Sequence, residues 1–177
     1  MSCQTLIGIV KTCDNNTGGI ARIFINRQDQ IDQTSIDYAP APNDYLIDQI
    51  SLIGGGDAFE EMEFRRNVSS YTEEAAIDLI NGSSYITQTI TLMFHRREHL
   101  KSKAIKILGA GQDYLAAVVL DMNGKYWYFP DLQLTGTGEG SGTARADGSK
   151  YSVTLTAENE NLAHEIDDAV AEALVGI

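Results

Sequence analysis

Two turn signals in the last third of the chain constrain the fold more than any other feature. An Asn-Gly pair at 123–124 separates an apolar segment from an aromatic one, and an Asp-Gly pair at 147–148 precedes residues 151–157, where apolar and polar side chains alternate. Such pairs supply the positive φ angles that tight hairpin turns need. Residues 114–157 are therefore predicted to form antiparallel β-sheet, with no room for a parallel βαβ unit.

The clearest strand in the middle of the chain is predicted at residues 86–94. Its apolar face is opposite a face that carries Thr87, Thr89 and Thr91, which are polar, uncharged and β-branched. Residues 73–80 stay open between a helix and a strand, because Ser70 and Glu73 could form a capping box whereas Asn-Gly at 81–82 could turn a hairpin. Further strands are predicted at residues 5–12 and 20–26, and residues 59–70 also show strand-like alternation, with Met62, Phe64, Arg66 and Val68 on one face.

Two helices are predicted. Residues 98–108 place apolar side chains on one helical stripe and lysines outside it, and Gly109 follows as a stop signal. A second stripe closes the chain and contains Ile166, Val170 and Leu174 at helical spacing. It is narrow and alanine-rich, so we expect this C-terminal helical arm, residues 161–177, to dock against a neighbouring surface.

Residues 27–58 show no periodicity and are longer than an ordinary connection inside a compact domain. We expect them to form an extended loop with a glycine hinge at 54–56. The loop would be held by something outside its own domain, with Tyr38 and Tyr45 buried against that partner.

Composition narrows the class of protein. A chain of 177 residues that is 43% hydrophobic can form one domain with a real core, so a single domain over 1–177 is predicted. A formal net charge of −12 argues against a protein that grips nucleic-acid phosphates. Cys3 and Cys13 are expected to be free thiols, and neither a signal peptide nor a membrane anchor is expected.

Two motifs could suggest chemistry, and neither is expected to carry it. The residues His95-Arg-Arg-Glu-His99 match a zinc motif, but they straddle the end of a strand and the start of a helix, and basic neighbours would repel a cation. The glycines from Gly136 to Gly142 resemble a phosphate loop, but another strand follows instead of a helix, so a flexible β-loop is expected. We predict no catalytic residues, no metal and no cofactor, and no enzyme.

A basic cluster at 96–106 and an aromatic run at 126–129 could together suggest a nucleic-acid platform. The aromatic side chains alternate along one strand, so half of them are expected in the core. The basic surface is expected to be a solvated face or a partner for a neighbour's carboxylates.

Four segments of the chain resemble, in the same order, segments of tail tube proteins of tailed bacteriophages, especially those of Bacteroidota hosts. They are Cys13-Asp-Asn-Asn-Thr-Gly-Gly to Phe24, Met62-Glu-Phe-Arg-Arg-Asn to Glu73, Val118 to Trp127, and Gly136-Thr-Gly-Glu-Gly to Glu160. The resemblance implies hexameric rings that stack into a hollow tube through which the genome passes. It also implies that inner sheets of neighbouring subunits join into one barrel, that loops and termini bridge successive rings, and that residues 73–80 belong to a β-hairpin.

The same resemblance implies a location and a set of partners. The protein would lie in the tail of the virion after assembly in the host cytoplasm, contacting other copies of itself, tape measure, terminator or baseplate proteins, and passing DNA without tight binding. Thr87, Thr89 and Thr91 would face the channel or an inter-subunit sheet. Contacts between subunits are expected from Tyr38, Tyr45, Phe64, Arg66, Ile166, Val170 and Leu174.

The predicted fold is mainly β: an antiparallel β-sandwich or flattened barrel with one flanking α-helix and a short C-terminal helix. Two alternatives to a phage tail tube remain. One is the inner tube of a contractile injection system or a ring at the head-to-tail junction. The other, from a different class, is a monomeric β-sandwich binding module, which would leave the long loop and the terminal helix without a purpose.

Overall fold

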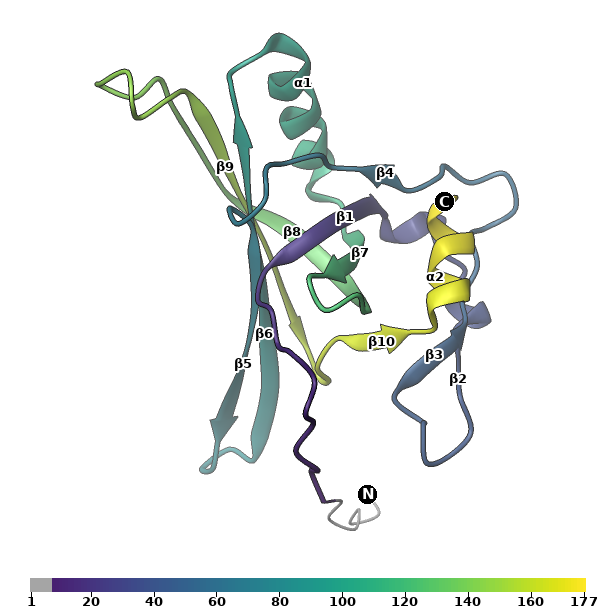
Figure 1. The fold of residues 1–177 in the computed structure, drawn as a ribbon. Helices are drawn as coiled ribbons and strands as arrows, with labels where there is room; N and C mark the ends of the chain where they lie inside the picture. The colour runs from purple at the N-terminus through teal and green to yellow at the C-terminus, as the bar shows by residue number, and fades with distance from the viewer. Residues whose placement is uncertain (1–7) are drawn as a thin grey trace.

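The computed structural model describes residues 8–177, with side chains described for all but residues 111 and 139. The chain is mainly β, with two short α-helices, as predicted (Figure 1). The strands are β1 (Ile20–Arg27), β2 (Asp37–Tyr38), β3 (Leu46–Gln49), β4 (Glu60–Glu61), β5 (Ser70–Asp78), β6 (Ser83–His95), β7 (Leu115–Asp121), β8 (Tyr126–Gly140), β9 (Lys150–Asn159) and β10 (His164–Ile166). The helices are α1 (His99–Leu108) and α2 (Asp168–Val175), with short 3-10 turns at Gln28–Gln30, Gln33–Ser35 and Ala110–Gln112.

One long strand, β8, belongs to two sheets. Its first half lies between β7 and β10 in a sheet of order β2-β3-β10-β8-β7-β1-β4, in which β3 and β10 are parallel. Its second half pairs with β9, which pairs with β6, which pairs with β5. We call the first the mixed sheet, and the second, formed by β5, β6, β9 and residues 133–140 of β8, the long-strand sheet.

The change of sheet takes place at Asp131. Its φ of 55° is a left-handed conformation that Asp tolerates better than most residues, and the register of β8 against β7 shifts there. This irregularity lets one strand bend from one layer to the next.

The mixed sheet is buried on both faces. One face packs against the long-strand sheet in a first core cluster that includes Ile23, Val119, Phe129 and Leu155. The other face packs against α2 and the segment after β1 in a second cluster. Strand β7 contributes to both clusters, which explains why its sequence is a continuous apolar run instead of an alternating one.

Several elements differ from the sequence-based expectations. The glycine-spaced run is not a flexible loop, because Gly136, Gly138 and Gly140 lie in β8 and pair with β9. The aromatic run is buried on both faces of β8, since Tyr126 and Tyr128 enter the second cluster while Phe129 enters the first. Residues 8–12 form no strand, and residues 5–7 lie outside the described part of the chain. Within residues 59–70 only Glu60–Glu61 (β4) and Ser70, the first residue of β5, lie in strands, and residues 66–67 form a turn.

The hairpin expected at 73–80 is present. Residues 70–78 form β5, which pairs with β6 along its full length. The expected helix at 98–108 is also present as α1, whose Ile105 and Leu108 pack on the first cluster. No helix among residues 8–177 is long and apolar enough to cross a membrane.

The segment 27–58 contains more regular structure than the extended loop that was expected. It contains two 3-10 turns, β2 and β3, and it places Ile31, Ile47 and Ile50 in the second core cluster. The expected glycine hinge is a turn closed by a hydrogen bond from the Gly56 N–H to the Ile53 carbonyl, and the Ile53 N–H in turn donates to the Gln30 carbonyl. Because β3 pairs with β10, which is more than a hundred residues away, local periodicity could not reveal this arrangement.

Candidate functional site

The outward face of the long-strand sheet is lined with hydroxyl groups. Thr91 lies between Ser70 of β5 and Thr154 of β9, and Thr89 lies between Thr72 and Thr156. These residues alternate with the buried side chains of the same strands, so they share the face opposite the core. The sequence had identified only the three threonines of β6; the same alternation in β9 would have identified Thr154 and Thr156.

Charged groups appear on this face only toward its ends. Thr87 lies between Glu74 and Glu158, near the β5–β6 turn, and His95 lies opposite Lys150 at the other end. The middle of the face is therefore polar, uncharged and β-branched across three strands. Such a face is stable in a sheet and offers no fixed charge to hold a passing ion or polymer.

Both lateral edges of the long-strand sheet are unpaired among the described residues. Strand β5 pairs only with β6, and beyond Leu132 the β8 strand pairs only with β9. The strands of this sheet lie side by side in the order β5-β6-β9-β8, and each strand is antiparallel to the next. Strands β5 and β8 therefore run in opposite directions. An edge of type β8 could therefore accept an edge of type β5 in antiparallel pairing.

These edges lack most of the sequence features that prevent one strand edge from pairing with another. Monomeric proteins blunt an edge with proline, lysine, bulges or a covering segment. Strand β5 is nine residues long and contains no proline or lysine, and residues 133–140 contain neither. The edge of β8 is approached at its start only, where the Gln133 side chain donates to the Gln112 carbonyl.

The outward positions near the β8 edge are glycines. Gly136 lies opposite Thr154 and Gly138 lies opposite Ser152. A Cβ atom added at either position would be 3.5 Å or more from any neighbouring atom, and neither has a positive φ. The fold of one chain therefore gives no reason for glycine here, whereas glycine inside a strand often marks a place where another backbone approaches closely.

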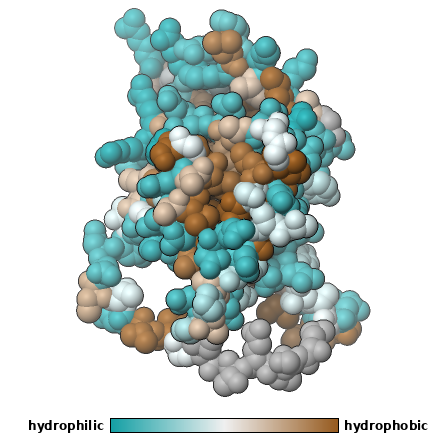
Figure 2. Space-filling model, turned by 90° about the vertical axis from the view of Figure 1, so that its right-hand side faces the viewer, coloured by the Kyte–Doolittle hydropathy of each residue, from teal (hydrophilic) through white to brown (hydrophobic). Residues whose placement is uncertain are grey.

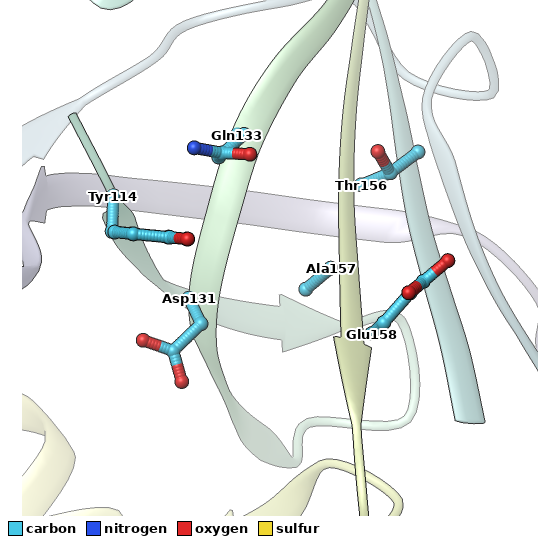
Figure 3. A pocket seen from close by; sticks show the side chains of 6 residues that line it. All are labelled: Tyr114, Asp131, Gln133, Thr156, Ala157 and Glu158. Carbon is cyan, nitrogen blue, oxygen red and sulfur yellow. The ribbon is translucent and has the colours of Figure 1, made fainter. Parts of the chain in front are cut away.

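A polar depression of about 550 Å³ lies beside the point where β8 leaves the mixed sheet (Figure 3). Tyr114, Asp131 and Gln133 lie on one side of it, and Thr156 and Glu158 lie on the β9 side. Burial raises the pKa of Asp131. The side chains offer neither a nucleophile with an adjacent base nor, anywhere in residues 8–177, three clustered metal ligands.

The zinc-like motif has the geometry expected from the sequence. His95 is the last residue of β6 and His99 is the first of α1, so the two imidazoles are not one helical turn apart. Lys101 donates from Nζ to the carbonyl of His95 and also pairs with Glu98. The segment is a strand-to-helix corner held by its own lysine.

The expected contact residues divide into two groups. Ile166 and Leu174 are buried in the second core cluster of their own chain, so a single chain does not present them on its surface, and their assignment to subunit contacts remains a prediction. Val170 packs partly against the same cluster. Phe64 packs partly on the first cluster, while Arg66 is exposed.

Tyr38 and Tyr45 are placed by their own chain. Each ring lies 5.0 Å, centroid to centroid, from the ring of His164 in β10. They still expose 41% and 56% of their surface, so their outer faces remain available. The side of the molecule that carries α2, opposite the long-strand sheet, has apolar side chains gathered near its centre (Figure 2).

The chain was compared with protein-family models, curated proteins and solved structures. No protein-family model matches the sequence, and no curated protein matches it. Among solved structures, Hcp1 from Salmonella typhimurium is similar at a TM-score of 0.38 and 12% sequence identity, over 82% of this chain and 98% of that one.

Proposed function

We propose that this chain is a structural subunit that closes into rings and builds a tube. Strand β5 of one copy would pair with residues 133–140 of β8 in the next copy. The single observation that carries the proposal is the pair of unpaired edges of opposite direction on one sheet.

Edge-to-edge pairing would satisfy the open backbone groups of both strands. It would also join the long-strand sheets of successive copies into one continuous antiparallel sheet. Because the two edges are different surfaces, the contact is heterologous, and a heterologous contact closes into a ring when the rotation between copies fits. Twist of the sheet favours such closure over a flat ribbon.

The hydroxyl face suggests which side of that sheet meets the channel. The opposite face is filled by the first core cluster and α1, so only the face of Thr72, Thr89, Thr91, Thr154 and Thr156 remains free to line a channel. An uncharged, hydrogen-bonding wall would let a charged polymer pass without fixed attachment points. The net charge of −12 per chain acts in the same direction for DNA.

Within this class of tube-forming proteins, the more specific function that we propose is that of a phage tail tube protein. The resemblance of the four sequence segments to bacteriophage tail tube proteins supports hexameric rings and a conduit for genome delivery. The subunit contacts proposed from Tyr38, Tyr45, Phe64 and Arg66 would then lie on the outer side of the ring, with tape measure, terminator or baseplate proteins as further partners. The inner tube of a contractile injection system fits the same edges and hydroxyl face.

Paired cysteines test the edge contact directly. In a background with Cys3→Ser and Cys13→Ser, Thr72→Cys in β5 would be combined in turn with Gln133→Cys, Gly136→Cys or Gly138→Cys in β8. All four positions are on the outward face, and the glycine sites have room for a side chain. Because a fixed register brings only one pair within disulfide distance, one combination should oxidise to a ladder of covalent oligomers that ends at a ring.

Two controls make the result decisive. Each single-cysteine variant should give no species larger than a dimer, and Thr72→Cys with Ile53→Cys should give no ladder, because Ile53 lies in the loop after β3. If the three edge pairs cross-link no better than this control under conditions where the protein is oligomeric, the edges do not form the ring.

A further inference from the structure

The two ends of the long-strand sheet carry opposite charge. At the end of the β5–β6 turn, residues 70–85 and 157–162 contain five carboxylates and no basic residue: Glu73, Glu74, Asp78, Glu158 and Glu160. The other end, where β6 enters α1 and β8 turns into β9, is rich in basic residues. Among the side chains that the structure describes there are Arg96, Arg97, Lys101, Lys103, Arg145 and Lys150, against Glu98 and Asp147. Figure 1 shows these ends at the bottom and the top of the molecule.

Some of these charges have no partner inside the chain. Among the described side chains, Lys103 and Arg145 form no ion pair, and neither do Glu158 and Glu160. Glu98, by contrast, is already paired with Arg96 and Lys101. The groups available for a contact are therefore acidic at one end and mainly basic at the other, where Asp147 accepts hydrogen bonds from the backbone N–H groups of Thr143 and Ala144.

The acidic end also presents an apolar tip. Leu79 and Ile80 are 90% and 95% exposed at the turn between β5 and β6, and Ile77 is exposed beside them. The turn is ordered, because Asp78 accepts hydrogen bonds from the backbone N–H groups of Ile80 and Asn81. An ordered turn that holds two large apolar side chains in water is typical of a contact surface.

The basic end has an apolar counterpart. Leu100 in the first turn of α1 is 66% exposed, and it lies next to Lys101 and near Lys103. Beside it, α1 and residues 61–63 enclose a mainly apolar groove of about 260 Å³. Its lining combines five apolar residues, Met62, Phe94, Ala104, Ile105 and Leu108, with Glu61, Glu63 and Lys101. Glu61, which also lines it, is neutralised by a two-point contact with Arg22.

We propose that these two ends bind each other in successive copies. The β5–β6 turn of one copy would place Leu79 and Ile80 against Leu100 and the adjacent groove of a second copy, with Glu158 and Glu160 facing Lys103 and Arg145. Opposite charge at the two ends selects head-to-tail over head-to-head contact. The inference rests on the proposed function: the contact runs along the strands, at right angles to the edge pairing, so it would stack rings into a tube.

Two variants separate stacking from ring closure. Leu79→Ser with Ile80→Ser removes the apolar tip, and Glu158→Lys with Glu160→Lys reverses charge outside edge strand β5. Both should still form rings and the cross-linked ladder, but electron micrographs should show single rings where the unaltered protein gives tubes. Raised salt should likewise shorten tubes while leaving rings closed, because exposed ion pairs are screened.

Matched controls make the same kinds of substitution on other parts of the surface. Ile53→Ser with Ile177→Ser removes exposed apolar groups on other elements, and Asp37→Lys with Asp44→Lys reverses the same charge near β2; both should leave tube length unchanged. Lys103→Glu with Arg145→Glu, added to the charge variant, should restore tubes. If both the tip variant and the charge variant stack into tubes as well as the unaltered protein does, the stacking contact is wrong, but the ring contact is not affected. If the unaltered protein forms no rings, the proposed function fails and this inference fails with it.

Discussion

The glycines in β8 and the glycine that follows it differ in whether the structure leaves room for a β-carbon. Gly136 and Gly138 lie inside a strand with room for a β-carbon, whereas Gly142 has a φ of 72° and a β-carbon there would lie 2.6 Å from Cβ of Asp147. We predict that Gly136→Ala or Gly138→Ala raises the free energy of unfolding of the monomer by about 0.5–1 kcal/mol, because alanine loses less backbone entropy in a strand. Gly142→Ala should lower it. Urea denaturation at low protein concentration measures both, and a loss of stability in the strand variants would contradict this account of β8.

The phenol of Tyr128 gives the fold a specific response to alkali. Tyr128 is buried in the second cluster, and this burial raises the pKa of its phenol from 10.0 to about 12. The folded chain therefore holds this proton more tightly than the unfolded chain, so its contribution is complete below about pH 10 and is lost as the pH rises toward 12. We predict that Tyr128→Phe reduces the loss of stability between about pH 8 and about pH 11 in urea denaturation, while Tyr114→Phe, at an exposed tyrosine, does not. Equal pH dependence in all three proteins would show that Tyr128 is not the group responsible.

At the scale of elements, α2 stabilises its own chain. Asp167 caps the helix by accepting the N–H of Ala169, and Ala171, Leu174 and Val175 close the second cluster. We predict that Leu174→Ala costs roughly 2–5 kcal/mol in guanidinium denaturation, because it opens a cavity in a packed core. Ala173→Ser, on the exposed side of α2, is the control and should cost little. A near-neutral Leu174→Ala would return this helix to the role of a detachable arm.

An element could be predicted from the sequence when its contacts are local in the chain, and could not when they are distant. The β7–β8 hairpin and α1 were predicted because turn residues and local periodicity determine them, whereas residues 73–80 stayed open until the family resemblance implied the β5–β6 hairpin. β3 and β10 were not, since each is short and gains its partner only from a distant segment. The strand character of Gly136–Gly140 was missed because glycine disfavours strands and only pairing with β9 maintains it there. Of the candidate site, the threonines of β6 were predicted, but the two free edges could be recognised only once the strand order was known.

For the whole molecule, charge and shape lead to one expectation about DNA. A net charge of −12 and an uncharged hydroxyl face should leave an assembled ring without affinity for a passing duplex. We predict no retention of duplex DNA in gel-shift experiments at physiological salt, for the unaltered protein and for Lys101→Glu with Lys103→Glu alike. Salt-sensitive binding that this double variant abolishes would place the basic end of the sheet in the channel.

The central claim is that copies of this chain pair through β5 and the distal half of β8, and cryo-electron microscopy of the concentrated protein tests it most directly. We predict closed rings whose inner wall is a continuous antiparallel barrel with four strands from each subunit, with β5 beside residues 133–140 of the neighbour and Thr89, Thr91 and Thr156 toward the channel. A particle that remains a monomer at every concentration, or a ring in which these two edges stay unpaired or the threonine face points away from the channel, would contradict the account.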